Sequence, residues 1–149
     1  MRTKPALFAD ARQTYLFVSG STKEAVGVAR NVPPSLARLR VVLTPGAPAW
    51  LAVDGTNMSS TFINPGAPVV SSHGPDDAIV WVLDENTLRT ASLQEPGTPR
   101  PILYAMDAAT TGTLWQSTDL EVGGKYSTAV VAHGTVIVGT DRLRAFGLR

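Results

Sequence analysis

The feature of this sequence that most constrains its fold is a pattern of short apolar segments that recurs along the chain. The matched positions are Pro5 with Pro68, Tyr15 with Ile79, and Trp50 with Trp115, which are 63, 64 and 65 residues apart. A shorter third copy begins near residue 127. Because the spacing stays nearly constant along four segments, the sequence predicts two four-stranded units and part of a third.

Each segment of the pattern has the composition of a β-strand. Val, Ile and Thr fill the segments, while 13 glycines and 11 prolines interrupt most windows long enough for a helix. We therefore expect an all-β chain of antiparallel strands with almost no helix. The expected strands are 5–9, 14–19, 36–42, 49–53, 67–71, 78–83, 101–106, 113–118, 127–132, 135–139 and 143–147.

The stretch LYAMDAATTGTLW, residues 103–115, has the form of two strands joined by a tight turn. Asp107 is expected to accept hydrogen bonds from the backbone of its own turn, and Gly112 to supply a conformation that other residues adopt poorly. Trp115 offers a large apolar surface for contact between neighbouring units, and Trp50 is expected to do the same one unit earlier. We expect Trp115 to be largely buried.

This stretch resembles the tryptophan-docking motif of the quinoprotein-like (PQQ-repeat) β-propellers, Ala-x-Asp-x-x-Thr-Gly-x-x-x-Trp. Ala105, Asp107, Thr110 and Trp115 match in register, whereas the glycine follows one place late, at Gly112. Residues 127–149 resemble the closing segment of the same family. The resemblance implies a β-propeller, in which four-stranded antiparallel blades stack around a central axis.

The resemblance also implies a domain organisation. Residues 1–149 are expected to form a single partial β-propeller, with blade 1 at about 5–54, blade 2 at about 67–118 and an incomplete blade 3 at about 127–149. Closed propellers typically have ~4–8 blades. We therefore expect the C-terminal fragment of a longer propeller, whose partners are the remaining blades. The alternative is a short chain that closes by self-association.

Composition excludes several classes of function. The net charge of +1 is too small to indicate a nucleic-acid partner. The absence of cysteine excludes a disulfide scaffold and a thiolate metal site. The longest apolar run, AIVWVL at 78–83, is far shorter than the ~18 residues of a membrane span. The N-terminal MRTKPALFAD lacks the apolar region of a signal peptide. The compartment stays open, and the resemblance alone implies a periplasmic or extracellular one.

The best indication of a binding surface is a pair of insertions at equivalent places, residues 20–35 and 84–98, each between the second and third strands of a unit. Insertions at one repeat position decorate one face, which is often the binding face. The loops between units share that face in a propeller. From these loops we predict Lys125, Tyr126, Asn57 and Asn64 as contacts for a protein or small-molecule ligand.

Charged groups elsewhere favour structural roles. Arg38 and Arg40 alternate on one face of a strand and are expected to be solvated charges that block aggregation. Asp84 and Glu85 are adjacent carboxylates at the end of an expected strand, and such pairs are usually solvated rather than a catalytic acid–base pair. His73 and His133 each precede a glycine and fit tight turns better than a metal site.

These observations together predict a non-catalytic binding or scaffold module with no catalytic residues, no metal site and no cofactor. The alternative is an enzyme, the C-terminal part of a pyrroloquinoline-quinone-dependent dehydrogenase, which would use that quinone and calcium. By resemblance, such enzymes carry vicinal cysteines and acidic calcium ligands. This chain has no cysteine and no recognisable ligand set, so we expect a binding module rather than an enzyme.

Overall fold

The structure is a computed structural model that describes residues 4–21, 32–87, 97–120 and 127–147. The described residues form eleven β-strands and no helix, as predicted. Within them, no helix is long and apolar enough to cross a membrane. The strands are β1 (Ala6–Ala9), β2 (Thr14–Ser19), β3 (Leu36–Val42), β4 (Trp50–Thr56), β5 (Val69–His73), β6 (Asp76–Asp84), β7 (Ile102–Asp107), β8 (Thr113–Gln116), β9 (Val130–Ala132), β10 (Thr135–Gly139) and β11 (Leu143–Gly147).

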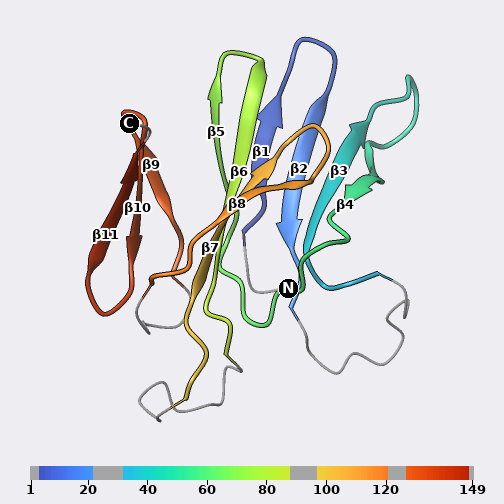
Figure 1. The fold of residues 1–149 in the computed structure, drawn as a ribbon. Helices are drawn as coiled ribbons and strands as arrows, with labels where there is room; N and C mark the ends of the chain where they lie inside the picture. Colours follow the sequence, from blue (N-terminus) through green and yellow to red (C-terminus); the bar gives the residue numbers. More distant parts are fainter. Residues whose placement is uncertain (1–3, 22–31, 88–96, 121–126, 148–149) are drawn as a thin grey trace.

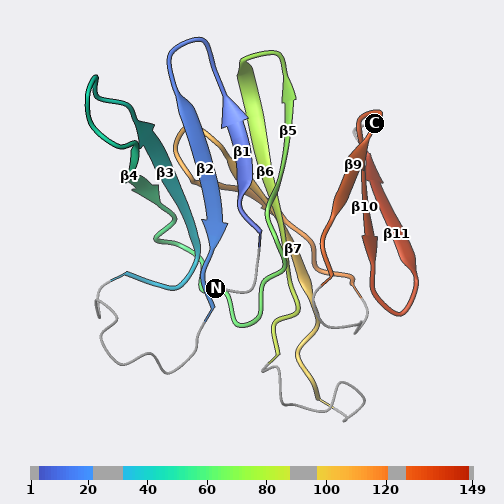
Figure 2. The ribbon, with the colours of Figure 1, turned by 180° about the vertical axis from the view of Figure 1, so that it is seen from behind.

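The strands form three antiparallel sheets in which strands adjacent in sequence pair with each other (Figure 1). The first sheet contains β1 to β4, the middle sheet β5 to β8, and the third sheet β9 to β11. The strand β1 contacts β5, and β5 contacts β9. The three sheets therefore adjoin along their first strands, with the middle sheet between the other two (Figure 2).

The middle sheet is covered on both faces because successive side chains of a strand point in opposite directions. Val80 and Val82 of β6 pack toward the first sheet, in a cluster with Phe17. Trp81 and Leu83 pack toward the third sheet, in a cluster that includes Val136 and Val138. This double coverage explains why β6 contains the unbroken apolar run AIVWVL rather than alternating apolar and polar residues.

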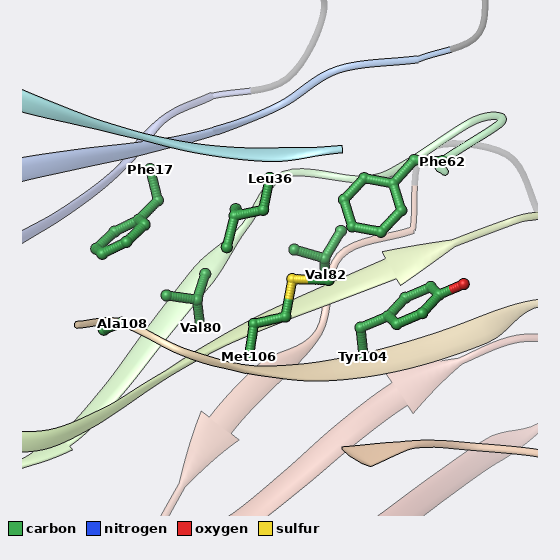
Figure 3. Close-up of a cluster of buried hydrophobic side chains, with 8 residues drawn as sticks. All are labelled: Phe17, Leu36, Phe62, Val80, Val82, Tyr104, Met106 and Ala108. Carbon is green, nitrogen blue, oxygen red and sulfur yellow. The ribbon is translucent and has the colours of Figure 1, made fainter. Parts of the chain in front are cut away.

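The first interface, between the first and middle sheets, holds the larger of the two buried clusters. Phe62, from the connection between β4 and β5, lies against Tyr104 with 5.1 Å between ring centroids. The backbone N–H of Phe62 donates to the Pro34 carbonyl at 2.8 Å and fixes this connection to the first sheet. Figure 3 shows the whole cluster: Phe17, Leu36, Phe62, Val80, Val82, Tyr104, Met106 and Ala108.

The two four-stranded sheets share an irregularity that aligns them. The pairing register shifts between Arg38 and Leu39 in the first sheet, and between Ala105 and Met106 in the middle sheet. Superposing these shifts makes Arg38 equivalent to Ala105. Their partners across the strand pair, Gly55 and Trp115, are then equivalent as well.

The alignment of Trp50 with Trp115 is therefore wrong. Trp50 pairs with Val42 at the beginning of β4, whereas Trp115 pairs with Ala105 next to the register shift. Matching by residue type alone missed this difference because β4 continues to Thr56, beyond its predicted end at residue 53.

The outward faces of the first and third sheets are apolar. In the first sheet a cross-strand row joins Leu7, Leu16, Leu39 and Val53. In the third sheet a row joins Val130, Ile137 and Ala145. An antiparallel sheet that faces water usually carries polar residues on that face. These two faces carry no charged residue at the alternate strand positions, so their composition is closer to that of covered sheets.

Candidate functional site

The predicted contact residues have separate locations in the structure. Lys125 and Tyr126 lie outside the described residues, as does much of both insertions. Asn57 and Asn64 are described, and both belong to the connection between β4 and β5. The backbone of Asn64 is engaged at both ends: its N–H donates to Asp84 Oδ1 at 2.7 Å, and its carbonyl accepts from Glu85 N at 3.2 Å.

Asn57 is 2% exposed, and its side chain is engaged within the protein. The Nδ2 group donates to the Thr111 carbonyl at 2.8 Å, and Oδ1 accepts from the N–H of Ser60 at 2.8 Å. Asn57 therefore links the first sheet to the turn that precedes β8. The sequence placed Asn57 in a loop, but no sequence signal showed that the loop packs against a turn 54 residues away.

Asp84 anchors the connection between the first and middle sheets. Its carboxylate is fully buried and accepts hydrogen bonds from the N–H groups of Ile63 at 2.9 Å, Asn64 at 2.7 Å and Asn86 at 3.2 Å. Burial raises the pKa of Asp84 above its ordinary value, and the three N–H donors oppose that rise. The expectation that this carboxylate is solvated is wrong, because the loop folds over the end of β6.

Glu85 lies beside the next connection, which leads into β9. The side chain is 1% exposed. Burial raises the pKa of Glu85 to about 7, the negative charge of Asp84 adds to the rise, and hydrogen bonding to Ser127 opposes it. Solvation was the wrong expectation for this residue also. Asp84 thus holds the first of two successive connections by hydrogen bonds, and the buried carboxyl group of Glu85 lies beside the second.

Gly66 lies where these connections meet. Its N–H donates to the Leu83 carbonyl, and its own carbonyl accepts from Ser19 Oγ at 2.9 Å. A Cβ atom on Gly66 would lie 2.0 Å from the Ser127 carbonyl oxygen. We call the cluster of Ser19, Gly66, Asp84, Glu85 and Ser127 the junction, because it joins all three sheets.

The turn between β7 and β8 contains the hydrogen bonds predicted for Asp107. Asp107 Oδ1 accepts from the N–H groups of Ala109 at 2.7 Å and Thr110 at 2.8 Å. The prediction for Gly112 is wrong, because Thr111 adopts the left-handed conformation, with φ of 62°, and Gly112 does not. Thr111 is buried, and Asn57 holds its carbonyl, so tertiary contacts impose a conformation that Thr disfavours.

Arg38 crosses the first interface to reach this turn. Its Nη1 donates to the carbonyls of Ala108, at 3.0 Å, and Ala109. Its Nη2 pairs with Asp54 Oδ2 at 2.8 Å, and its guanidinium carbon lies 5.0 Å from the centroid of the Tyr15 ring. Arg38 is therefore a contact between sheets rather than a solvated charge. Its neighbour Arg40 is more exposed and lies 3.7 Å from Asp54.

A cleft of about 320 Å³ opens beside Arg38, at the edge of the first interface. The charged groups that line it are Arg38 and the carboxylates of four aspartates, and Tyr15 and Phe8 supply aromatic surface. Asp10 and Asp107 each use a carboxylate oxygen to hold their own turns. The full lining is Phe8, Asp10, Tyr15, Arg38, Pro75, Asp76, Asp77, Ala78, Asp107, Ala108 and Ala109.

Trp115 lies across the second interface, between the middle and third sheets. Its ring meets Phe146 of β11 edge to face, with 5.5 Å between centroids. The expectation of a largely buried ring is wrong, since Trp115 is 42% exposed. Trp50 is 56% exposed and does not occupy the equivalent place. Phe146 therefore covers only part of the Trp115 ring.

The described residues contain no group of three His, Asp or Glu side chains that could hold a metal ion. The polar groups that are present fix turns, connections and interfaces. Comparisons with protein-family models, with curated proteins and with solved structures gave no match. The assignment of a function therefore depends on the sequence and the geometry alone.

Proposed function

We propose that this chain is a non-catalytic binding or scaffold module of the quinoprotein-like β-propeller type. The observation that carries the proposal is the stacking of three antiparallel sheets that adjoin along their first strands, with the middle sheet buried on both faces. Propeller blades have this strand order and this face-to-face arrangement. Within the motif from Ala105 to Trp115, the turn hydrogen bonds of Asp107 support the same family, whereas the exposed Trp115 and the conformation of Gly112 do not.

The polar residues of the chain also support a scaffold. Asp84, Asn57 and Arg38 are strongly engaged polar groups, and each holds a connection or an interface. Such groups keep the sheets in fixed relative positions and leave the loops available for a partner. We retain Lys125 and Tyr126 as the proposed contact residues on the loop face.

A calorimetric titration with pyrroloquinoline quinone in the presence of calcium tests the proposal against the dehydrogenase alternative. A scaffold module should give no binding heat beyond that of a titration with calcium alone. Sub-micromolar affinity for the quinone would overturn the proposal and favour the enzyme. The titration needs no knowledge of the natural partner.

A further inference from the structure

We propose that two copies of this chain assemble head to tail into a ring, with the outward face of the first sheet of one copy packed against the outward face of the third sheet of the other. The inference rests on the proposed function, since it assigns that scaffold a partner, and it takes self-association with a second copy of the same chain in place of the remaining blades of a longer propeller. It starts from the composition of the two end faces.

Alternation along the strands places Leu7, Leu16, Val18, Leu39, Leu51 and Val53 on the outward face of the first sheet. No charged residue occupies an alternate position of β1 to β4 on this face. Leu7 is 66% and Val53 72% exposed. The outward face of the third sheet, with Val130, Ile137, Leu143 and Ala145, is likewise uncharged. Uncharged apolar faces of this kind mark interaction surfaces.

The two interfaces within the chain indicate which face fits which. Superposition of the register shifts makes Leu16 and Val18 of the first sheet equivalent to Val80 and Val82 of the middle sheet. Val80 and Val82 are fully buried against the face of the first sheet that carries Phe17. The face of the middle sheet that is equivalent to the Leu16 face of the first sheet is thus covered by the Phe17 face of the first sheet. We call these two kinds of face the Leu16 type and the Phe17 type.

The second interface repeats this relation. Val136 and Val138 of the third sheet pack against the face of the middle sheet that carries Trp81. Trp81 follows Val80 just as Phe17 follows Leu16, so the Trp81 face of the middle sheet is of the Phe17 type. Both interfaces therefore pair a face of the Leu16 type with a face of the Phe17 type. On the third sheet, the residue that follows Val136 is Ile137, on the outward face. The Ile137 face is thus of the Phe17 type, and by the pairing seen in both interfaces it should cover the Leu16 face of the first sheet of another copy.

A contact between two different faces generates either a closed ring or an open filament. Each copy contributes three sheets, so two copies contribute six. Six sheets lie within the range of ~4–8 blades of closed propellers. A two-copy ring has a twofold axis and buries both end faces of both copies. It therefore leaves no apolar end face to recruit a third copy.

Analytical ultracentrifugation of the full chain from about 1 to 100 μM tests the ring, with variants on each face. The wild-type chain should sediment as a dimer with twice the mass of the 15.7 kDa chain. Leu39→Glu on the first sheet and Ile137→Glu on the third should each raise the dimer dissociation constant by at least ~100-fold, because a carboxylate would enter an apolar contact. Leu43→Glu places the same charge at an exposed leucine outside the β3 ladder and should leave the dimer intact.

Mixing the two impaired variants distinguishes head-to-tail from symmetric contacts. A mixed ring of Leu39→Glu and Ile137→Glu keeps one unaltered interface, so the mixture should recover dimer that neither variant forms alone. If either single variant dimerises like wild type, the contact joins like faces and the proposal is wrong. A monomer at 100 μM, or a growing series of oligomers, would also overturn it.

Two further measurements keep the result interpretable. Far-UV circular dichroism and thermal melting show whether each variant folds, and Leu7→Glu serves as a second first-sheet variant at a more exposed position. A folded monomer that does not bind quinone would overturn the ring and leave the scaffold proposal intact. A dimer that binds quinone tightly would overturn the scaffold proposal and leave the ring intact.

Discussion

The two interfaces between sheets are held by opposite chemistry at an equivalent position. In the first interface Arg38 reaches across to the turn of the middle sheet, and its cross-strand partner is Gly55. In the second interface Trp115 reaches across to Phe146, and its cross-strand partner is Ala105. Each pair combines one large side chain with one small residue, but the large one lies on the third strand in one sheet and on the fourth in the other. The sheet geometry thus fixes where a bridging side chain is needed and leaves its chemistry open.

The largest expected effect is at the charged bridge. Arg38→Ala should lower the free energy of unfolding by about 2–4 kcal/mol, because it removes the closer of the two ion pairs of Asp54 and leaves two carbonyls without their donor. Arg40→Ala is the matched control and should cost less than about 1 kcal/mol, since exposed ion pairs contribute little. Urea denaturation measures both. Equal losses for the two variants would show that Arg38 does not bridge the interface.

The connection beside the second interface should make stability depend on pH. The pKa of Glu85 is about 7 in the folded chain and 4.5 as its ordinary value, so between these values the folded state binds more protons than the unfolded state. The free energy of unfolding should therefore fall as pH rises through this window, by at most about 3 kcal/mol.

Glu85→Gln should remove most of this dependence and stabilise the chain at pH 8. The exposed Asp76 provides a control for the loss of one carboxylate, through Asp76→Asn. Urea titrations at pH 5, 6, 7 and 8 measure the slope for each variant. A wild-type chain that gains stability from pH 5 to 8 would contradict the assigned burial of Glu85.

The aromatic bridge should contribute less than the charged one because it is partly exposed. Trp115→Ala should cost about 1–3 kcal/mol, below the ~3–5 kcal/mol of a fully buried aromatic residue. Trp50→Ala should cost less than about 0.5 kcal/mol. A double-mutant cycle with Phe146→Ala should give a coupling energy of about 0.5–1.5 kcal/mol. Zero coupling would remove the ring contact from the second interface.

The smallest effect should come from the glycine of the turn that Arg38 contacts. Gly112 does not adopt a left-handed conformation, so Gly112→Ala should change stability by no more than about 0.5 kcal/mol. Gly134, with φ of 72°, lies in the turn before β10 and provides the contrast. Gly134→Ala should cost about 1 kcal/mol or more. Thermal melting of both variants decides which residue carries the strained conformation.

The strands and their order were predictable from local sequence. Apolar runs bounded by turn residues predicted all eleven strands. Their order followed because each sheet pairs strands that are neighbours in sequence. The contacts between sheets were not predictable in the same way. Arg38 and Asn57 act on a turn 54 to 71 residues away, and no local pattern records such distances. Tertiary contacts also imposed the conformation of Thr111, against the preference of its residue type.

The double coverage of the middle sheet sets the order in which backbone amides become accessible to solvent. The first or third sheet can detach by opening one interface, whereas β6 is freed only when both interfaces open. Local opening events exchange amide hydrogens at the edges of a structure, and the most protected amides report the global free energy. Hydrogen–deuterium exchange should therefore proceed inward from β4 and β11, and reach Val80 and Val82 only when the whole chain unfolds.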